Sequence, residues 1–103
     1  MTADDPSTMT VPELAAAMYE HLRATEELPI DPTANRWLGE AQAAAADVAD
    51  GDPPESVLAK RAAQVEHLLE NAGETGHPEG QRRVEAAHAA ATELTERLGE
   101  PKR

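Results

Sequence analysis

The chain of 103 residues contains no cysteine and no phenylalanine, and it has a single tryptophan and a single tyrosine. Without cysteine it can form neither a disulfide nor a thiolate metal site, so a disulfide-rich secreted scaffold and a cysteine-type zinc finger are both excluded. No apolar run approaches the roughly 20 residues that a transmembrane helix needs, and we expect no membrane contact. The opening residues, MTADDPSTMT, lack the basic and apolar regions of a signal peptide. We therefore expect a cytoplasmic location.

Positive charge is also scarce. The chain has 20 Asp and Glu against 9 Lys and Arg, a formal net charge of -11, and its lysines are Lys60 and Lys102. Such a surface repels phosphate backbones and anionic lipids, so we expect neither nucleic acid nor a membrane as a partner. An acidic surface with few lysines and many alanines is typical of cytoplasmic proteins in multimolar salt, where salt screens the repulsion. We interpret the charge as salt adaptation, with an acidic functional surface as the alternative.

Alanine dominates the apolar residues, and β-branched residues are sparse, which favours helix throughout the chain. Proline is tolerated in the first turn of a helix and is costly inside one, so the prolines at positions 12, 32, 53–54 and 78 predict four helix starts. Thr10 with Glu13 and Asp52 with Glu55 have the spacing of a capping box, and Asp31 precedes Pro32 as an N-cap. Glycines at positions 51, 73 and 99 predict helix ends.

Apolar residues recur at helical spacing after each predicted start. The links are short, and the link around residues 50–52 forces its two helices to be antiparallel neighbours. The sequence therefore predicts an all-α protein, a four-helix up-down-up-down bundle built from two antiparallel helical hairpins. We expect a disordered tail over residues 1–9, one domain over 10–99 and a C-terminal tail over 100–103. The glycine-rich stretch 74–80 is interpreted as a flexible connection, because it lacks the features of a phosphate loop.

Apolar side chains larger than alanine are few, so the predicted core is thin. Close packing through alanine would compensate for this, and so would oligomerisation that buries a second face. We expect a homodimer.

Histidines and glutamates are the candidates for acid-base chemistry or metal binding. Glu85 and His88 have the Glu-x-x-His spacing that places two ligands on one helical face, as in di-iron carboxylate bundles, but such bundles need this motif twice and here it occurs once. Glu85, His88 and His67 are the metal candidates. The alternative is that both histidines lie at the border of a buried helix face, without a ligand.

Trp37 and the pair Arg82-Arg83 are the candidates for a protein interface, because tryptophan and arginine are enriched in interface hot spots. The alternative is that Trp37 packs in the core and that the arginines pair with nearby glutamates. No Ser/His/Asp or Cys/His arrangement is present, which favours a protein that is not an enzyme, and we expect no cofactor.

The acidic, Ala-, Glu- and Asp-rich sequence with few lysines resembles small uncharacterised proteins of salt-loving archaea. The segment 34–73 also resembles archaeal helical-hairpin proteins of unknown function. The resemblance lies in an alanine-rich helix, the turn Gly51-Asp52, and a second helix that ends in Leu68-Leu69-x-x-x-Gly73. It covers under half of the chain, and it implies no activity and no functional residue.

Taken together, these observations predict a non-enzymatic helical protein that acts through protein-protein contact, either with a protein partner or with a second copy as a homodimer. The alternative is an accessory or degenerate helical bundle that handles a metal or a nucleotide with Glu and His side chains.

Overall fold

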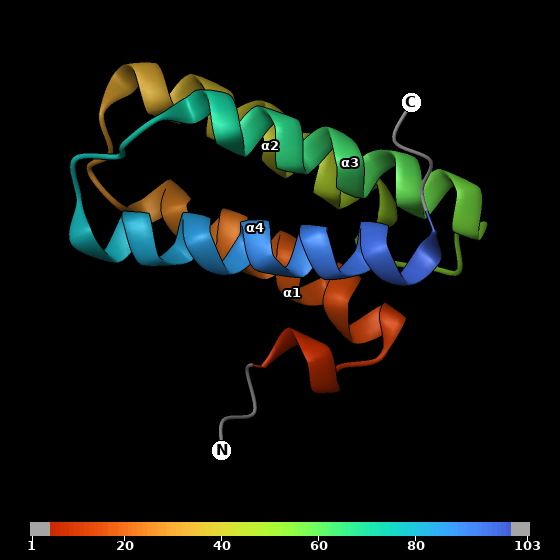
Figure 1. Cartoon of the computed structure of the whole chain (residues 1–103). Coiled ribbons are helices and arrows are strands. Elements are labelled where there is room, and N and C mark those ends of the chain that lie inside the picture. The colour runs from red at the N-terminus through yellow and green to blue at the C-terminus, as the bar shows by residue number, and fades with distance from the viewer. Residues whose placement is uncertain (1–4, 100–103) are drawn as a thin grey trace.

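The computed structural model describes residues 5–99, which contain four α-helices and no strand. The helices are α1 (Val11–Ala24), α2 (Pro32–Ala49), α3 (Glu55–Ala72) and α4 (Pro78–Leu98), and the 3-10 turns η1 (Pro6–Thr8) and η2 (Thr25–Glu27) flank α1. Consecutive helices run in opposite directions (Figure 1). The predicted all-α four-helix bundle is confirmed. None of the helices in residues 5–99 is long and apolar enough to cross a membrane.

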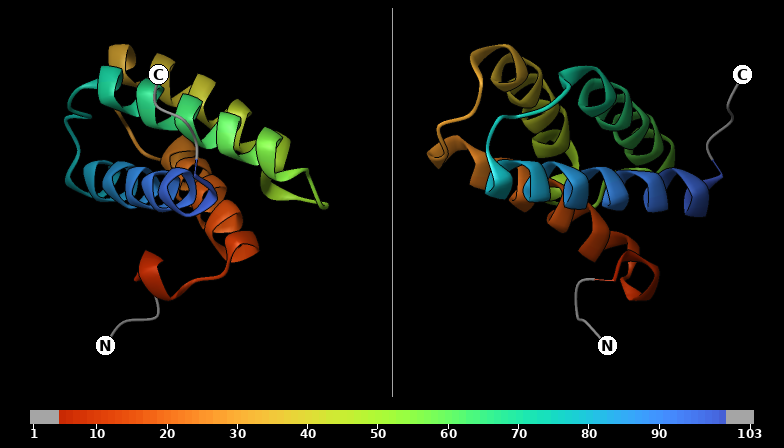
Figure 2. Two further views of the ribbon diagram at one scale, coloured as in Figure 1. Left: turned by 45° about the vertical axis from the view of Figure 1, so that its right-hand side comes forward. Right: turned by 60° about the vertical axis from the view of Figure 1, so that its left-hand side comes forward.

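The four helices pack as two layers. The most extensive contacts join α2 to α3 and α1 to α4, and α3 packs against α4 more than α1 packs against α2. The α2–α3 layer lies across the α1–α4 layer in both views of Figure 2. Helix α4 therefore has two seams, one with α1 and one with α3, and the candidate sites described below lie along them.

Two predicted helix starts are confirmed in detail. The hydroxyl of Thr10 accepts from the backbone N–H of Glu13 at 3.2 Å, and the Glu13 carboxylate accepts from the N–H of Thr10 at 2.9 Å. This is a complete capping box at the start of α1. The Asp31 carboxylate accepts from the N–H of Thr33 at 3.1 Å and caps α2, with Pro32 in the first turn.

The predicted capping box of α3 is wrong. Helix α3 begins at Glu55, its N-cap is Pro54, and no side chain caps it. The backbone of Pro54 is extended, with φ of -58° and ψ of 148°. A residue that precedes a proline is disfavoured in the helical conformation, and this applies to Asp52 before Pro53 and to Pro53 before Pro54. The helix therefore begins after the two prolines, at Glu55, and Asp52 is not its N-cap.

Alanine forms much of the core. The alanines with no exposed surface alternate along the helices with larger buried side chains, and this lets the backbones approach closely. Trp37 is only partly buried, at the border of this core. Among residues 5–99, Val57 is the exposed large hydrophobic side chain, at 41%. The fully buried alanines are Ala34, Ala41, Ala45, Ala62, Ala87 and Ala91, and the largest fully buried apolar side chains are Leu14, Met18, Leu22, Leu38, Leu94, Val48 and Val65.

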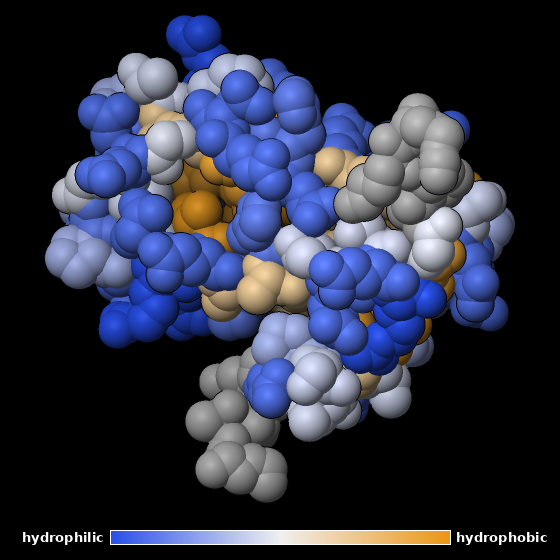
Figure 3. Space-filling view, viewed as in Figure 1, coloured by the Kyte–Doolittle hydropathy of each residue, from blue (hydrophilic) through white to orange (hydrophobic). Residues whose placement is uncertain are grey.

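Hydrophilic residues cover most of the face shown in Figure 3, and apolar residues are visible in a hollow between α3 and α4. The face is otherwise polar because each helix turns its charged residues outward. Outside the hollow, the described residues of this face therefore form no large apolar patch, and the distinguishing features of the molecular surface are a groove lined by small residues and clusters of charged residues.

Residues 5–9 make hydrogen bonds within η1 and with the end of α4. Asp5 caps η1 by accepting from the N–H of Ser7 at 3.0 Å, and Arg97 at the end of α4 donates to the carbonyl oxygens of Met9 and, at 3.2 Å, of Pro6. Met9 then packs against the core. Residues 1–4 and the predicted tail over 100–103 lie outside the described residues.

The connection between α3 and α4 is held in place rather than flexible. Thr75, which has no exposed surface, accepts from the N–H of Asp31 through its carbonyl oxygen at 2.9 Å. The N–H of Thr75 donates to the side chain of Gln81 at 3.0 Å, and its hydroxyl accepts from the N–H of His77 at 3.1 Å. Gly80 is so close to this connection that a Cβ there would lie 3.0 Å from the side chain of Ile30. Gly80 therefore allows close packing at this end of the bundle.

Candidate functional site

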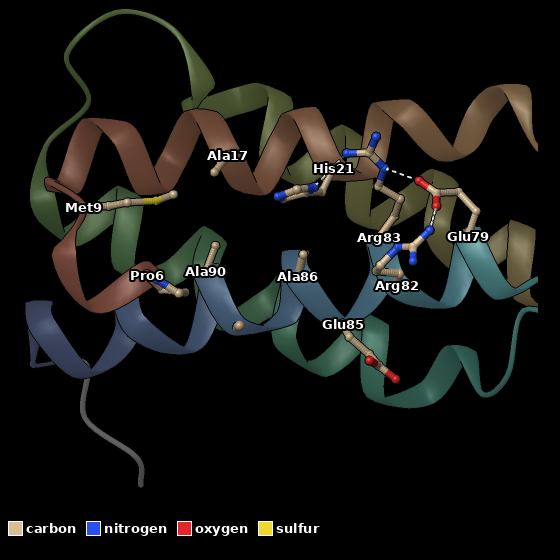
Figure 4. Close-up of a pocket in the computed structure, with 11 residues that line it drawn as sticks. Pro6, Met9, Ala17, His21, Glu79, Arg82, Arg83, Glu85, Ala86 and Ala90 are labelled. Atoms are coloured by element: carbon tan, nitrogen blue, oxygen red, sulfur yellow. Dashed lines mark hydrogen bonds and ion pairs between the residues drawn. The ribbon is translucent and has the colours of Figure 1, made fainter. Parts of the chain in front are cut away.

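A groove of about 540 Å³ lies on the seam between α1 and α4 and extends to η1. Its lining includes four alanines, one on α1 and three on α4, with Met9 at one end and charged residues at the other (Figure 4). The alanines are Ala17, Ala86, Ala89 and Ala90. Because alanine projects only a methyl group, this seam leaves a shallow trough where larger side chains would fill the space between the helices.

The charged end of the groove is ordered by ion pairs. Arg83 donates from Nε to the Glu79 carboxylate at 3.0 Å, and Arg82 pairs with the other oxygen of the same carboxylate. Arg83 also contacts Nδ1 of His21, on α1, at 3.2 Å. A guanidinium has only donors, so in this contact Nδ1 of His21 is the acceptor. The Arg82 side chain is 73% exposed and faces solvent at the mouth of the groove.

The shape of the groove suits an elongated ligand. On α4 its lining runs from Glu79 to Ala90, a rise of about 17 Å along the helix axis. Small-molecule sites usually enclose most of their ligand, whereas this groove is partly open to solvent. An amphipathic helix or another extended segment can lie along such a trough with its small apolar side chains facing the alanines.

A second cluster lies on the opposite seam, between α3 and α4. Glu66 and Glu70 are one helical turn apart on α3 and face His88 on α4. One ligand atom from each of the three side chains lies within 4.8 Å of the others. His88 Nε2 lies 3.0 Å from a Glu70 carboxylate oxygen.

Two threonines of α4 contact this cluster. The hydroxyl of Thr92 donates to Glu66 at 2.6 Å, and the hydroxyl of Thr95 lies 3.3 Å from the other oxygen of the same carboxylate. Thr95 also donates to the carbonyl oxygen of Thr92 at 2.9 Å, so Thr92 is the main partner of Glu66. The Glu66 carboxylate therefore links α3 to α4 across the helix seam.

The structure brings some of the sequence candidates together and separates others. Arg82 and Arg83 both lie at the groove, whereas Trp37, on α2, does not line it. His88 lies in the α3–α4 cluster. Glu85 lines the edge of the groove and points away from the arginines (Figure 4). His67 is exposed on α3, with the side chain of Asn71 3.4 Å from its Nε2.

Sequence reasoning did not single out Glu66 and Glu70. Their spacing of four residues, which puts two carboxylates on one helical face, is a signal that was present in the sequence. That signal is weak in a glutamate-rich chain, and the position of His88 opposite them depends on how α3 packs on α4. The alanine groove was missed for the same reason, because its walls come from α1 and α4, at opposite ends of the sequence.

Comparison with known proteins places the chain in one family. The model of the family described as Domain of unknown function (DUF8152) matches residues 14–100, and the chain belongs to this family. No curated protein and no solved structure matches the chain.

Proposed function

We propose that this member of a family of unknown function is a non-enzymatic binding protein, and that an amphipathic helix of a partner protein docks in the groove between α1 and α4. The observation that carries the proposal is the alanine lining of the groove. The groove runs along about three helical turns of α4, and its alanines, Ala17 on α1 and three on the single turn 86–90 of α4, form the part that a helix with small residues on one face can approach closely.

The charges indicate how the partner helix is oriented. The chain as a whole has a net charge of -11, yet the end of the groove carries Arg82 and Arg83. Glu79 neutralises part of this charge, and the exposed guanidinium of Arg82 still has donors for another carboxylate. We therefore expect the partner helix to place an acidic residue beside Arg82 and apolar residues along the alanines.

A partner protein is favoured over a second copy of the chain. Two copies that each carry a charge of -11 repel one another unless salt screens them. Stable homodimers also bury large apolar faces. Among residues 5–99, Val57 is the large hydrophobic side chain that is exposed, and it lies outside the groove. A homodimer would therefore bury less apolar surface than a complex with a partner helix, because the partner helix contributes an apolar face of its own.

A matched pair of variants tests the proposal. Ala89→Tyr fills the groove from an exposed position on α4, and Ala43→Tyr makes the same change at an exposed position on α2, away from the groove. The wild type is first used to capture partners from native lysate at high KCl. A photo-reactive residue at position 86 then identifies the partner segment, and binding of the matching synthetic peptide is measured for each variant.

We expect the peptide to bind the wild type and Ala43→Tyr alike, and to bind Ala89→Tyr at least about tenfold more weakly, because its trough is filled. Circular dichroism confirms that both variants remain helical. Equal binding by Ala89→Tyr would contradict the proposal, as would the absence of any captured partner under gentle crosslinking. A dimer in sedimentation equilibrium that Ala89→Tyr dissociates would instead place a second copy in the groove.

A further inference from the structure

We propose that Glu66, Glu70 and His88 form a binding site for one divalent transition-metal ion that bridges α3 and α4. The site is separate from the groove, because it lies on the other seam of α4 and shares no residue with the groove lining. Its failure or success therefore leaves the docking proposal unaffected.

The spacing of the three side chains suits a metal ion. Transition metals bind nitrogen and oxygen ligands at about 2.1 Å, so two ligand atoms on one ion lie about 3.0 to 3.5 Å apart. His88 Nε2 and the Glu70 oxygen are already 3.0 Å apart, and the Glu66 oxygen lies within 4.8 Å of both. Metal binding therefore requires the Glu66 oxygen to move closer to the other two ligand atoms, through a change in side-chain torsions.

The ligands also have the surroundings that metal-binding carboxylates need. The hydroxyl of Thr92 donates to Glu66 at 2.6 Å, and each carboxylate oxygen has a further lone pair for a metal ion. The two ligands of α3 are four residues apart, and His88 comes from α4, so both helices hold the site. The Glu70 side chain is 60% exposed and His88 is 36% exposed, which gives an ion direct access from solvent.

The chemistry of the ligands indicates the class of metal. Imidazole nitrogen with two carboxylates suits Zn²⁺, Mn²⁺ or Fe²⁺, whereas Ca²⁺ prefers six to eight oxygen ligands. Three protein ligands leave the remaining positions to water. His88 Nε2 and the Glu70 oxygen lie at hydrogen-bond distance, 3.0 Å, so a metal ion that binds both atoms takes the place of that hydrogen bond.

Zn²⁺ titration of the full chain tests the site. In isothermal calorimetry we expect one Zn²⁺ per chain, and long-range nitrogen NMR should show the His88 Nε2 resonance shift on binding. Thermal unfolding should move to higher temperature, because a ligand that binds only the folded chain stabilises it. Ca²⁺ serves as the comparison ion and should bind at least about tenfold more weakly.

Matched variants separate this cluster from other histidines and glutamates. His88→Ala and Glu70→Gln should each weaken Zn²⁺ binding by at least about tenfold. His67→Ala and Glu85→Gln make the same chemical changes outside the cluster and should bind Zn²⁺ like the wild type. All four positions are partly or fully exposed, and circular dichroism confirms that the variants fold.

Three results would overturn the proposal. They are the absence of Zn²⁺ binding by the wild type, equal loss of binding in His67→Ala and His88→Ala, and Ca²⁺ binding as tight as that of Zn²⁺. Loss in Glu85→Gln with retention in Glu70→Gln would place the metal at the Glu-x-x-His pair of α4 and would overturn it as well.

Discussion

Replacing Thr75 with valine tests how the bundle fixes the connection between α3 and α4. Valine has nearly the same shape as threonine, so the substitution removes the hydroxyl and keeps the volume of a side chain that has no exposed surface. The Thr75 hydroxyl accepts from the N–H of His77 at 3.1 Å and donates to the His77 carbonyl oxygen at 2.9 Å. The hydroxyl also lies 3.2 Å from the side-chain oxygen of Gln81, a second acceptor, so the substitution affects three hydrogen-bond contacts.

These three contacts differ in what their loss leaves behind. The carbonyl oxygen of His77 keeps a partner, because the N–H of Gln81 donates to it at 2.8 Å. The side-chain oxygen of Gln81 keeps the N–H of Thr75, at 3.0 Å. The His77 N–H is left without the hydroxyl in a part-buried position. One lost hydrogen bond costs about 1 kcal/mol and an unpaired buried donor costs about 1–3 kcal/mol. We expect Thr75→Val to lower the free energy of unfolding by about 2 kcal/mol.

Urea unfolding followed by far-ultraviolet circular dichroism measures this change. For a chain of this length, about 2 kcal/mol corresponds to a fall of roughly 8 °C in Tm. Thr75→Ser is the control, because it keeps the hydroxyl and loses only a methyl group, which is worth about 0.8 kcal/mol. If Thr75→Val were no more destabilising than Thr75→Ser, the hydroxyl would not hold the connection and the reasoning would be refuted.

Two further predictions concern the start of α1 and the surface charge. Thr10→Ala removes one half of the capping box and should lower the free energy of unfolding, measured in urea, by about 1 kcal/mol. Thr33→Ala, at an exposed position in the first turn of α2, is the control and should lower it much less, because the Asp31 carboxylate caps that helix. Equal losses in the two variants would contradict the role of the cap. Raising KCl from about 0.1 M to about 1 M shortens the Debye length from about 10 Å to about 3 Å, so the free energy of unfolding of a chain with a net charge of -11 should rise. A stability that is unchanged or lower in KCl would exclude salt adaptation as the meaning of the acidic surface.

The helices and their ends could be predicted from local sequence because local interactions form them. Thr10 and Glu13 satisfy the first backbone groups of α1 by themselves, and Gly73 and Gly99 end α3 and α4 with positive φ values of 72° and 70°. The error at Asp52 arose from a local conflict. Capping-box spacing and a double proline occupy the same residues, and the steric restriction of proline prevailed.

Neither candidate site could be predicted in the same way, because each combines residues that are distant in sequence. His88 was a candidate from its own spacing to Glu85, yet its neighbours in the structure are Glu66 and Glu70, from another helix. Arg82 and Arg83 were candidates because they are adjacent cations. The trough beside them depends on Ala17 of α1, about 65 residues earlier in the chain. The periodicity of one helix shows which face is apolar and leaves open which helix covers it.

The sequence by itself determined the helical class, the number of helices within residues 5–99, most of their ends and the acidic surface, because these depend on neighbours within one or two turns. Only the tertiary structure decided that α4 packs between α1 and α3, that Thr75 joins two connections, and that two glutamates of α3 face His88. The physical reason is the small size of alanine. Alanine faces pack against almost any partner helix, so the pairing is selected by the few large core side chains and by the connections acting together.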